Sequence, residues 1–212
     1  MKTNDIFPNR QLYQFGYCAV FAKSVAPAEL LARAGGEGLH PVALTRTETA
    51  HIEALGEDID EDYVHDVSLA QLQDSGILAS DGPVLRAGEH EGWSFVIEPE
   101  GSYLAADDIV KSASRQTVAL SLRDSESGSC WISYAEDGEI LSSFDPLFPD
   151  NDYGTRPEVL KELTGLVAAI SNGDRADAYA NAVRAIQQRL QCTVPQEADE
   201  SRLLTIKIAE GY

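Results

Sequence analysis

The sequence predicts an α+β fold over residues 1–212, with a largely antiparallel sheet and helices packed on it. Segments with strand character outnumber segments with helical periodicity, and most of these strands follow one another at hairpin-like spacing. Asp137-Gly138, the strongest two-residue hairpin signal, stands between two apolar strand runs. A chain of 212 residues is long enough to bury a sizeable core without disulfides. We therefore expect one α+β domain, with an acidic, insert-like segment at about 47–82.

The N-terminal part predicts a strand, a helix and a second strand. Residues 17–22 are apolar, aromatic and β-branched, which favours a strand. Pro27 fits the first turn of a helix, because its missing N–H would be unpaired there, and Gly35-Gly36 ends that helix. Residues 41–44 predict the second strand.

Five further elements are expected between residues 68 and 122. Ser68 and Gln71 form a capping-box pattern that opens a short helix, and Gly76 ends it. The remaining four are two strands over 83–98 around the turn 88–92, a short helix near 106–114, and a strand over 117–122.

A hairpin centred on Asp137-Gly138 is the best-defined unit, because a type I′ turn needs positive φ at both positions. Counting outward pairs Glu136 with Glu139, and the pairs that follow run to Trp131 with Phe144. This register places on one face Trp131, Ala135, Ile140 and Phe144, and on the other Ile132, Tyr134 and Leu141. Both faces are largely apolar, so we expect the hairpin to be covered on both sides.

The C-terminal part predicts two helices and a last strand. Thr155 and Glu158 form a capping box, and apolar residues recur at helical spacing as far as Ile170. Asp174 then caps a second helix through Leu190, and residues 203–208 form the strand.

The formal charge of −19 is concentrated in two acid-only windows. Residues 47–85 hold ten Asp or Glu and residues 124–155 hold eight, with no Lys or Arg in either window. Clustered charge of one sign creates a field that can select partners. In residues 124–155 the acids fall at a hairpin tip and in turns, where they serve local geometry, so the first window is the better place to look for a partner.

The acids of the first window gather in a group that we predict to bind a basic protein partner. This group consists of Glu57, Asp58, Asp60, Glu61 and Asp62. Their spacing partly matches a calcium loop, but Tyr63 stands where the turn needs Gly and Leu69 where a bidentate Glu is needed. The alternatives left open are non-specific cation attraction and a solvated acidic loop.

The sequence contains no signature of a nucleophile, a metal or a cofactor. Ser127 and Ser129 do not form a G-x-S-x-G elbow, and the glycines at 35–38 lack the Lys-Ser/Thr of a P-loop. Cys18, Cys130 and Cys192 lie far apart in apolar surroundings, which predicts buried, reduced thiols. We expect no catalytic or metal-binding residue that sequence alone can name.

A groove formed by four residues is the other candidate site. Its members are Trp93, Glu98, Asp145 and Tyr153. In the segment 143–149, which has two prolines and two phenylalanines, the structural interpretation is that Phe144 and Phe148 pack inward and Asp145 caps the turn. The functional interpretation is that Asp145 and Tyr153 line the groove.

Parts of the sequence resemble an uncharacterised actinobacterial family of domain-of-unknown-function proteins. The resemblance lies in residues 15–36 and 92–170, especially in the segments 17–21, 92–99, 131–139 and 143–149. It consists of turns and packing residues, so it implies a shared fold and no activity. The acidic stretch 48–81 is the part least like the family pattern.

We derive three hypotheses for the function. The first is a non-enzymatic binding protein whose acidic surface engages a basic partner, with an immunity or antitoxin-like role as one version. The second is a hydrolase that uses carboxylates in a cleft near Glu98 and Asp145. The third is acidity that serves solubility or salt tolerance alone.

Composition also sets an expected location. The start of the chain lacks a signal-peptide h-region, and no run approaches the length of a membrane span. With a pI near 4.4, direct binding to nucleic acid or to anionic membranes is not expected. We therefore expect a cytoplasmic protein, and the resemblance to an actinobacterial family implies a bacterial one.

Overall fold

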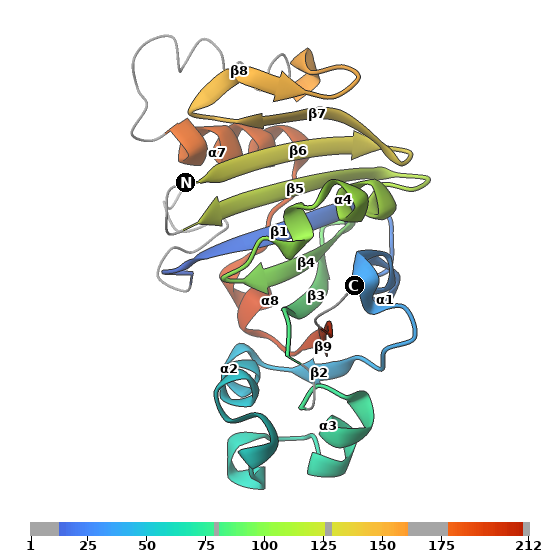
Figure 1. The fold of residues 1–212 in the computed structure, drawn as a ribbon, viewed down its shortest axis with the longest axis vertical. Helices are drawn as coiled ribbons and strands as arrows, with labels where there is room; N and C mark the ends of the chain where they lie inside the picture. Colours follow the sequence, from blue (N-terminus) through green and yellow to red (C-terminus); the bar gives the residue numbers. More distant parts are fainter. Residues whose placement is uncertain (1–12, 79–80, 126–128, 161–177, 210–212) are drawn as a thin grey trace.

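The computed structural model describes residues 13–78, 81–125, 129–160 and 178–209. In this part of the chain nine strands form one antiparallel sheet in the order β2-β9-β3-β4-β1-β5-β6-β7-β8 (Figure 1). The strands are β1 (Gly16–Lys23), β2 (Val42–Leu44), β3 (Val84–His90), β4 (Trp93–Pro99), β5 (Val118–Ser125), β6 (Cys130–Glu136), β7 (Glu139–Asp145), β8 (Phe148–Tyr153) and β9 (Leu203–Lys207). The predicted α+β class with a largely antiparallel sheet is confirmed.

Helices lie on both faces of this sheet and beyond its β2 edge (Figure 1). The α-helices are α1 (Pro27–Leu31), α2 (Arg46–Leu55), α3 (Leu69–Ser75), α4 (Asp107–Ala113), α7 (Ala178–Leu190) and α8 (Gln196–Glu200). Short turns of other helical type are η1 (Ala32–Gly36), η2 (Gly56–Asp58), η3 (Glu61–Tyr63) and η4 (Tyr103–Ala105).

Two hydrophobic layers sandwich the sheet. On one face α7 contributes Tyr179, Val183 and Ile186 to a core with Phe95 and Phe144. On the other face, α1 and α4 cover a second core. Neighbouring residues of a strand point to opposite faces, so each strand supplies both layers. This explains why the central strands are apolar on both sides.

A third, smaller core holds together residues 45–78, which we call the lobe. The buried members of this core are Leu44 at the end of β2 and, from the lobe, Ile52, Ile59, Val64, Leu72 and Ile77. The lobe lies beyond strand β2, at one end of the molecule (Figure 1). The lobe covers most of the acidic segment expected at about 47–82, and this segment has a hydrophobic core separate from the two cores of the sheet.

Most of the predicted elements are present, but the predicted pairing within the 131–144 hairpin is wrong beyond its first two pairs. Asp137 and Gly138 do have positive φ, at 50° and 85°. Leu141, however, is an extra residue in β7, so Tyr134 pairs with Ser142 and Ile132 with Phe144. A β-bulge moves all subsequent side chains to the other face. Phe144 therefore faces the α7 core, while Ala135 and Ile140 pack on Val110 of α4.

The bulge is stabilised by Thr155 and Arg156, which lie more than ten residues further along the sequence. The carbonyls of Ile140 and Leu141 accept backbone N–H groups from Thr155 and Arg156, at 3.1 and 2.8 Å. A local count of residues from the turn cannot include these partners. The predicted helix from Thr155 to Ile170 and the Asp174 cap lie largely outside the described residues, whereas the second helix is present as α7.

Candidate functional site

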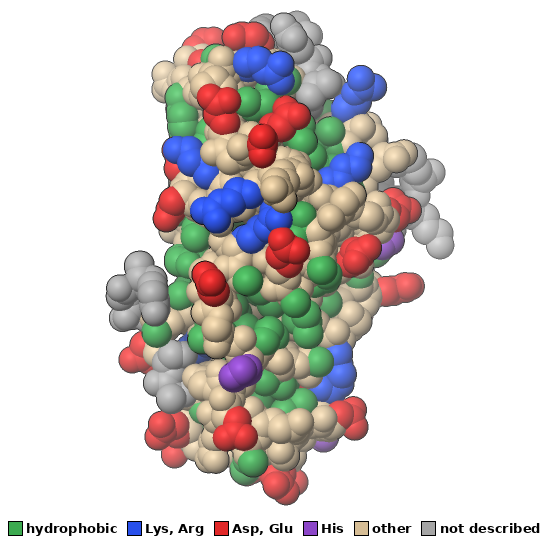
Figure 2. Space-filling view, turned by 90° about the vertical axis from the view of Figure 1, so that its right-hand side faces the viewer, with side chains coloured by type: hydrophobic (Ala, Val, Ile, Leu, Met, Phe, Trp, Pro, Cys, Tyr) green, Lys and Arg blue, Asp and Glu red, His purple; other side chains and the backbone are tan. Residues whose placement is uncertain are grey.

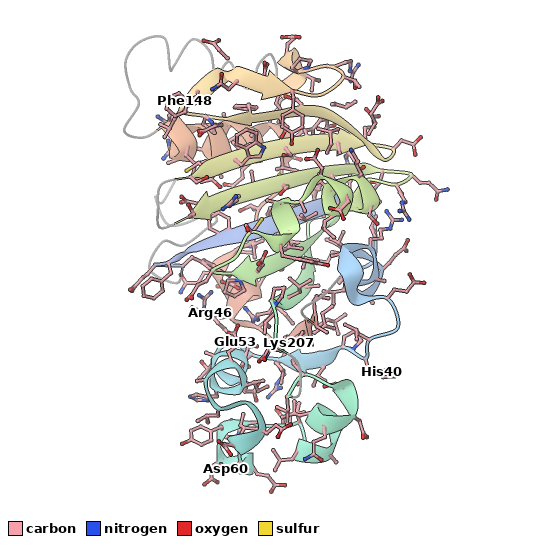
Figure 3. The ribbon with its side chains drawn as sticks, viewed as in Figure 1. His40, Arg46, Glu53, Asp60, Phe148 and Lys207 are labelled. Atoms are coloured by element: carbon pink, nitrogen blue, oxygen red, sulfur yellow. The ribbon has the colours of Figure 1, made fainter. Side chains whose placement is uncertain are left out.

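All five predicted partner-binding acids lie at the far end of the lobe, in η2, η3 and the two residues between them. Each of their side chains is exposed, and Figure 3 places Asp60 at the extremity of the molecule. Ile59 and Val64 are buried in the core of the lobe and anchor this segment from within. Because the apolar residues point inward, the acids are directed to solvent. We call Glu57, Asp58, Asp60, Glu61 and Asp62 the acidic tip.

The charge of the acidic tip is not neutralised by neighbouring cations. Within the described residues none of the five carboxylates forms an ion pair, and the one contact of their side chains is from Asp62 N–H to Asp60 Oδ1, at 2.9 Å. In Figure 2, acidic side chains lie at the lower end of the face that is drawn, and most of the Lys and Arg side chains lie in its upper half. Unpaired charges of one sign on an ordered surface produce the long-range field expected of a steering site.

Glu48 and Arg202 connect the lobe to the sheet. Glu48, buried in α2, accepts the backbone N–H groups of Thr45 and His65, at 2.8 and 2.7 Å. Arg202, just before β9, donates Nη2 to Glu48 Oε1 at 2.7 Å. Burial raises the pKa of Glu48, but the hydrogen bonds from Thr45, His65 and Arg202 outweigh it, so that the pKa lies below its ordinary value. The charged form of Glu48 is therefore the one that holds the lobe in place.

The four residues of the predicted groove do not line one groove. Trp93 and Glu98 stand on opposite faces of β4, since Trp93 belongs to the α7 core and Glu98 pairs with Cys18 on the other face. Asp145 Oδ1 accepts the N–H of Leu147 at 2.8 Å, as the structural interpretation predicted. The inward position predicted for Phe148 is wrong, because this side chain is 54% exposed on the edge strand β8.

Glu98 has a clear structural role on its face of the sheet. It is buried and accepts the backbone N–H groups of Tyr103 and Leu104, at 3.2 and 3.0 Å, which begins the turn η4. A Cβ atom at Gly101 would lie 1.5 Å from Glu98 Oε1, so only glycine permits this close approach. Burial raises the pKa of Glu98, against the lowering effect of these hydrogen bonds.

Tyr153 joins a cluster that the sequence did not indicate. Its hydroxyl donates to Asp107 Oδ1 at 2.6 Å, and its ring centroid lies 6.1 Å from that of Trp131. Trp131 Nε1 donates to Ser143 Oγ at 2.7 Å. Here the polar groups satisfy one another, so the cluster ties β8 to β6 and α4.

A buried ionic network around Asp199 was also missed from sequence. The carboxylate of Asp199 accepts Arg86 Nη1 at 3.0 Å, Arg46 Nη1 at 3.1 Å and the Tyr13 hydroxyl at 2.9 Å. Arg86 is buried, and burial lowers the pKa of its guanidinium while Asp199 opposes that shift. A small pocket of about 210 Å³ opens beside Tyr13 and Arg46. No sequence signal could have found these residues, because they are joined only by the fold.

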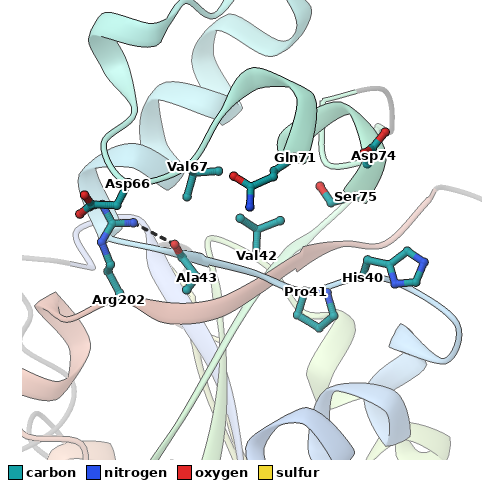
Figure 4. A pocket seen from close by; sticks show the side chains of 10 residues that line it. All are labelled: His40, Pro41, Val42, Ala43, Asp66, Val67, Gln71, Asp74, Ser75 and Arg202. Carbon is teal, nitrogen blue, oxygen red and sulfur yellow. Dashed lines mark hydrogen bonds and ion pairs between the residues drawn. The ribbon is translucent and has the colours of Figure 1, made fainter.

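A larger, open pocket of about 390 Å³ lies between the lobe and the edge strand β2 (Figure 4). Val42 points into this pocket from below, and Val67 and Gln71 face it from α3 and the segment before it. Arg202 and Asp66 close one end, at 3.3 Å from each other, while His40 and Asp74 flank the other end. The pocket thus has apolar walls with charged groups at its two ends.

The thiols do not resemble catalytic nucleophiles. Cys18, Cys130 and Cys192 are buried and free, as predicted. Burial raises the pKa of Cys18, and it raises that of Cys192 to about 12, so neither forms a thiolate readily. Among the described residues, no group of three or more His, Cys, Asp or Glu could hold a metal ion. No helix of this part is long and apolar enough to cross a membrane.

Comparison with known proteins gives one match. A family model described as a family of unknown function, DUF6461, matches residues 5–192. No curated protein matches the chain, and no solved structure matches it.

Proposed function

Since the chain belongs to the DUF6461 family, whose function is unknown, we propose a function from its own surface: a non-enzymatic binding protein whose acidic tip engages a basic protein partner. An immunity or antitoxin-like role against a basic effector, in a bacterial cytoplasm, is one form of this proposal. The observation that carries it is the set of five exposed carboxylates without ion-pair partners in the described part of the chain.

The construction of the lobe supports a role beyond solubility. A surface that only needs charge can carry it on loops, whereas this tip is fixed by the buried side chains of Ile59 and Val64. An ordered set of charges can match a complementary partner, which accelerates association and rejects partners of like charge. The lobe is in turn held to the sheet by the bonds of Glu48.

Neutralising the tip tests this function. We expect the combined variant Glu57→Gln, Asp58→Asn, Glu61→Gln and Asp62→Asn to slow partner association by about tenfold or more, because the steering field is lost. Asp60 is retained because it caps η3. The measurement is a pull-down at low and high salt with mass spectrometry, followed by association kinetics on the purified partner.

The matched control removes the same charge elsewhere. This control variant combines Glu136→Gln, Glu139→Gln, Asp150→Asn and Glu197→Gln. The four acids are exposed, their side chains form no hydrogen bond or ion pair among the described residues, and the variant should keep the partner. The proposal fails if no basic partner shows salt-sensitive capture, or if both variants bind equally well. Equal binding would favour acidity as a solubility device.

The hydrolase alternative has one supporting observation, the burial that raises the pKa of Glu98. Neither of the two pockets described above contains Glu98 or Asp145. For Glu98→Gln we expect a loss of about 1 to 2 kcal/mol of unfolding free energy, because an amide can accept only one of the two N–H groups. Partner binding should be unchanged.

Thermal unfolding measures the change in stability caused by Glu98→Gln. Assays with p-nitrophenyl esters and glycosides measure any hydrolytic activity of the wild type and of this variant. Asp150→Asn, on the exposed edge strand, serves as the control. Hydrolysis by the wild type that is abolished in a folded Glu98→Gln variant would support the hydrolase and overturn the binding proposal.

A further inference from the structure

The pocket between β2 and α3 lies on the same lobe as the acidic tip, and the proposed function does not use it. Its volume of about 390 Å³ falls within the range of ligand sites, roughly 300 to 1,000 Å³. Val42 and Val67 supply apolar walls on opposite sides. Such a pocket suits a side chain with a long aliphatic portion.

The charged residues that line the pocket determine whether a positive or a negative group would bind in it. Arg202 is the cation of the lining, and it already contacts Glu48 at 2.7 Å and Asp66 at 3.3 Å. It also donates to the carbonyls of Ala43 and His65. Asp74, at the open end, is exposed and has no hydrogen bond or ion pair among the described residues. The free charge of the pocket is therefore negative.

The mode of binding follows from the edge strand. Strand β2 pairs with β9 on one side and is the last strand of the sheet. Its other edge is of the kind to which a partner strand can be added. Arg202 Nη1 already occupies the carbonyl of Ala43 at 2.9 Å, and β2 is only three residues long. These two features disfavour the addition of a strand to β2, so we expect a partner to insert a side chain into the pocket instead.

We infer that this pocket is the subsite that receives a Lys or Arg side chain of the basic partner. The aliphatic stem packs between Val42 and Val67, and the cationic head lies against the carboxylate of Asp74 at the mouth. This inference rests on the proposed function and deepens it, because it divides recognition into long-range steering by the tip and short-range capture by the pocket.

The test uses an acetylated, amidated tetra-arginine peptide labelled with a fluorophore, and a tetra-glutamine peptide as the uncharged comparison. We expect Asp74→Asn to weaken arginine-peptide binding by about two- to fivefold at moderate salt, the range of an exposed ion pair. Asp74→Lys should weaken it further. Asp81→Asn, an exposed acid that does not line the pocket, should have a clearly smaller effect. Backbone amide NMR should show peptide-induced shifts at Val42 and Val67.

The outcomes separate the two proposals. Equal losses for Asp74→Asn and Asp81→Asn, or shifts confined to residues 57–62, would overturn the subsite while leaving the acidic tip in place. Absence of any difference between the two peptides would also overturn it. The pull-down with the neutralised tip then decides the proposed function independently.

Discussion

Replacing Asp199 with Asn is expected to cost about 3 to 5 kcal/mol of unfolding free energy, the usual effect of breaking a buried ion pair from one side. The carboxylate of Asp199 balances Arg86 and Arg46, and it accepts the hydroxyl of Tyr13. Without that charge, Arg86 would remain a buried cation whose pKa burial already lowers. Chemical denaturation monitored by tryptophan fluorescence gives the measurement.

Two controls make the Asp199 result interpretable. Glu197→Gln removes an exposed acid from the same helix, α8, and should change the unfolding free energy by less than about 0.5 kcal/mol. The double variant Asp199→Asn with Arg86→Met should recover part of the loss, because the uncompensated cation is gone. Strictly additive losses would contradict the network.

Replacing Glu48 with Gln is expected to cost about 3 kcal/mol and to loosen the lobe before the sheet unfolds. An amide cannot accept both N–H groups of Thr45 and His65 and also balance the charge of Arg202. Hydrogen exchange measured by mass spectrometry should show faster exchange in α2 and α3, while the strands of the sheet stay protected.

The lowered pKa of Glu48 predicts that the stability of the lobe depends on pH. The pKa of Glu48 is lowered in the folded protein from its ordinary value of 4.5, so its stabilisation is present above that value. It is lost as the pH falls through the folded pKa. The protection factors of the lobe amides, which correct for the slower intrinsic exchange at acid pH, should therefore fall as the wild type is acidified. This fall should be smaller in Glu48→Gln.

Glu53, on the same helix as Glu48, is the matched control, because its pKa is shifted in the opposite direction. Desolvation and the charge of Glu100 raise its pKa, so ionisation opposes folding as the pH rises above the ordinary value. Glu53→Gln should leave the stability of the lobe unchanged or slightly higher at neutral pH. A loss equal to that of Glu48→Gln would refute the role assigned to the Glu48 bonds.

Local signals predicted elements well where the deciding contacts are local. Ser68 and Gln71 cap α3 as their spacing indicated, and Gly76 ends it with a φ of 76°. Helix α2 was missed even though Thr45 and Glu48 form the same kind of capping box. Glu48 also falls in the acid-only window 47–85, where it counts as one of the ten acids as well as a capping residue.

Predictions that depend on distant partners failed. The register of the 131–144 hairpin changes because N–H groups of Thr155 and Arg156 hold the bulge carbonyls. Phe148 was expected inside, but β8 is the last strand of the sheet and exposes it. The placement of Trp93 and Glu98 in one groove failed for a local reason instead. The two residues are five positions apart, and the side chains of a strand alternate between its two faces.

The sequence by itself determined the α+β class, most of the elements, the buried thiols and the position of the acid-rich segment. These follow from composition, periodicity and turn chemistry, which act over a few residues. Only the tertiary structure decided which acids remain free. Glu48 is bonded by Arg202, 154 positions away, and Asp199 is bonded by Tyr13, 186 positions away. The five acids of the tip, in contrast, form no ion pair in the part of the chain that the structure describes. Charge can be counted along a chain, but its compensation depends on which side chains the fold brings together.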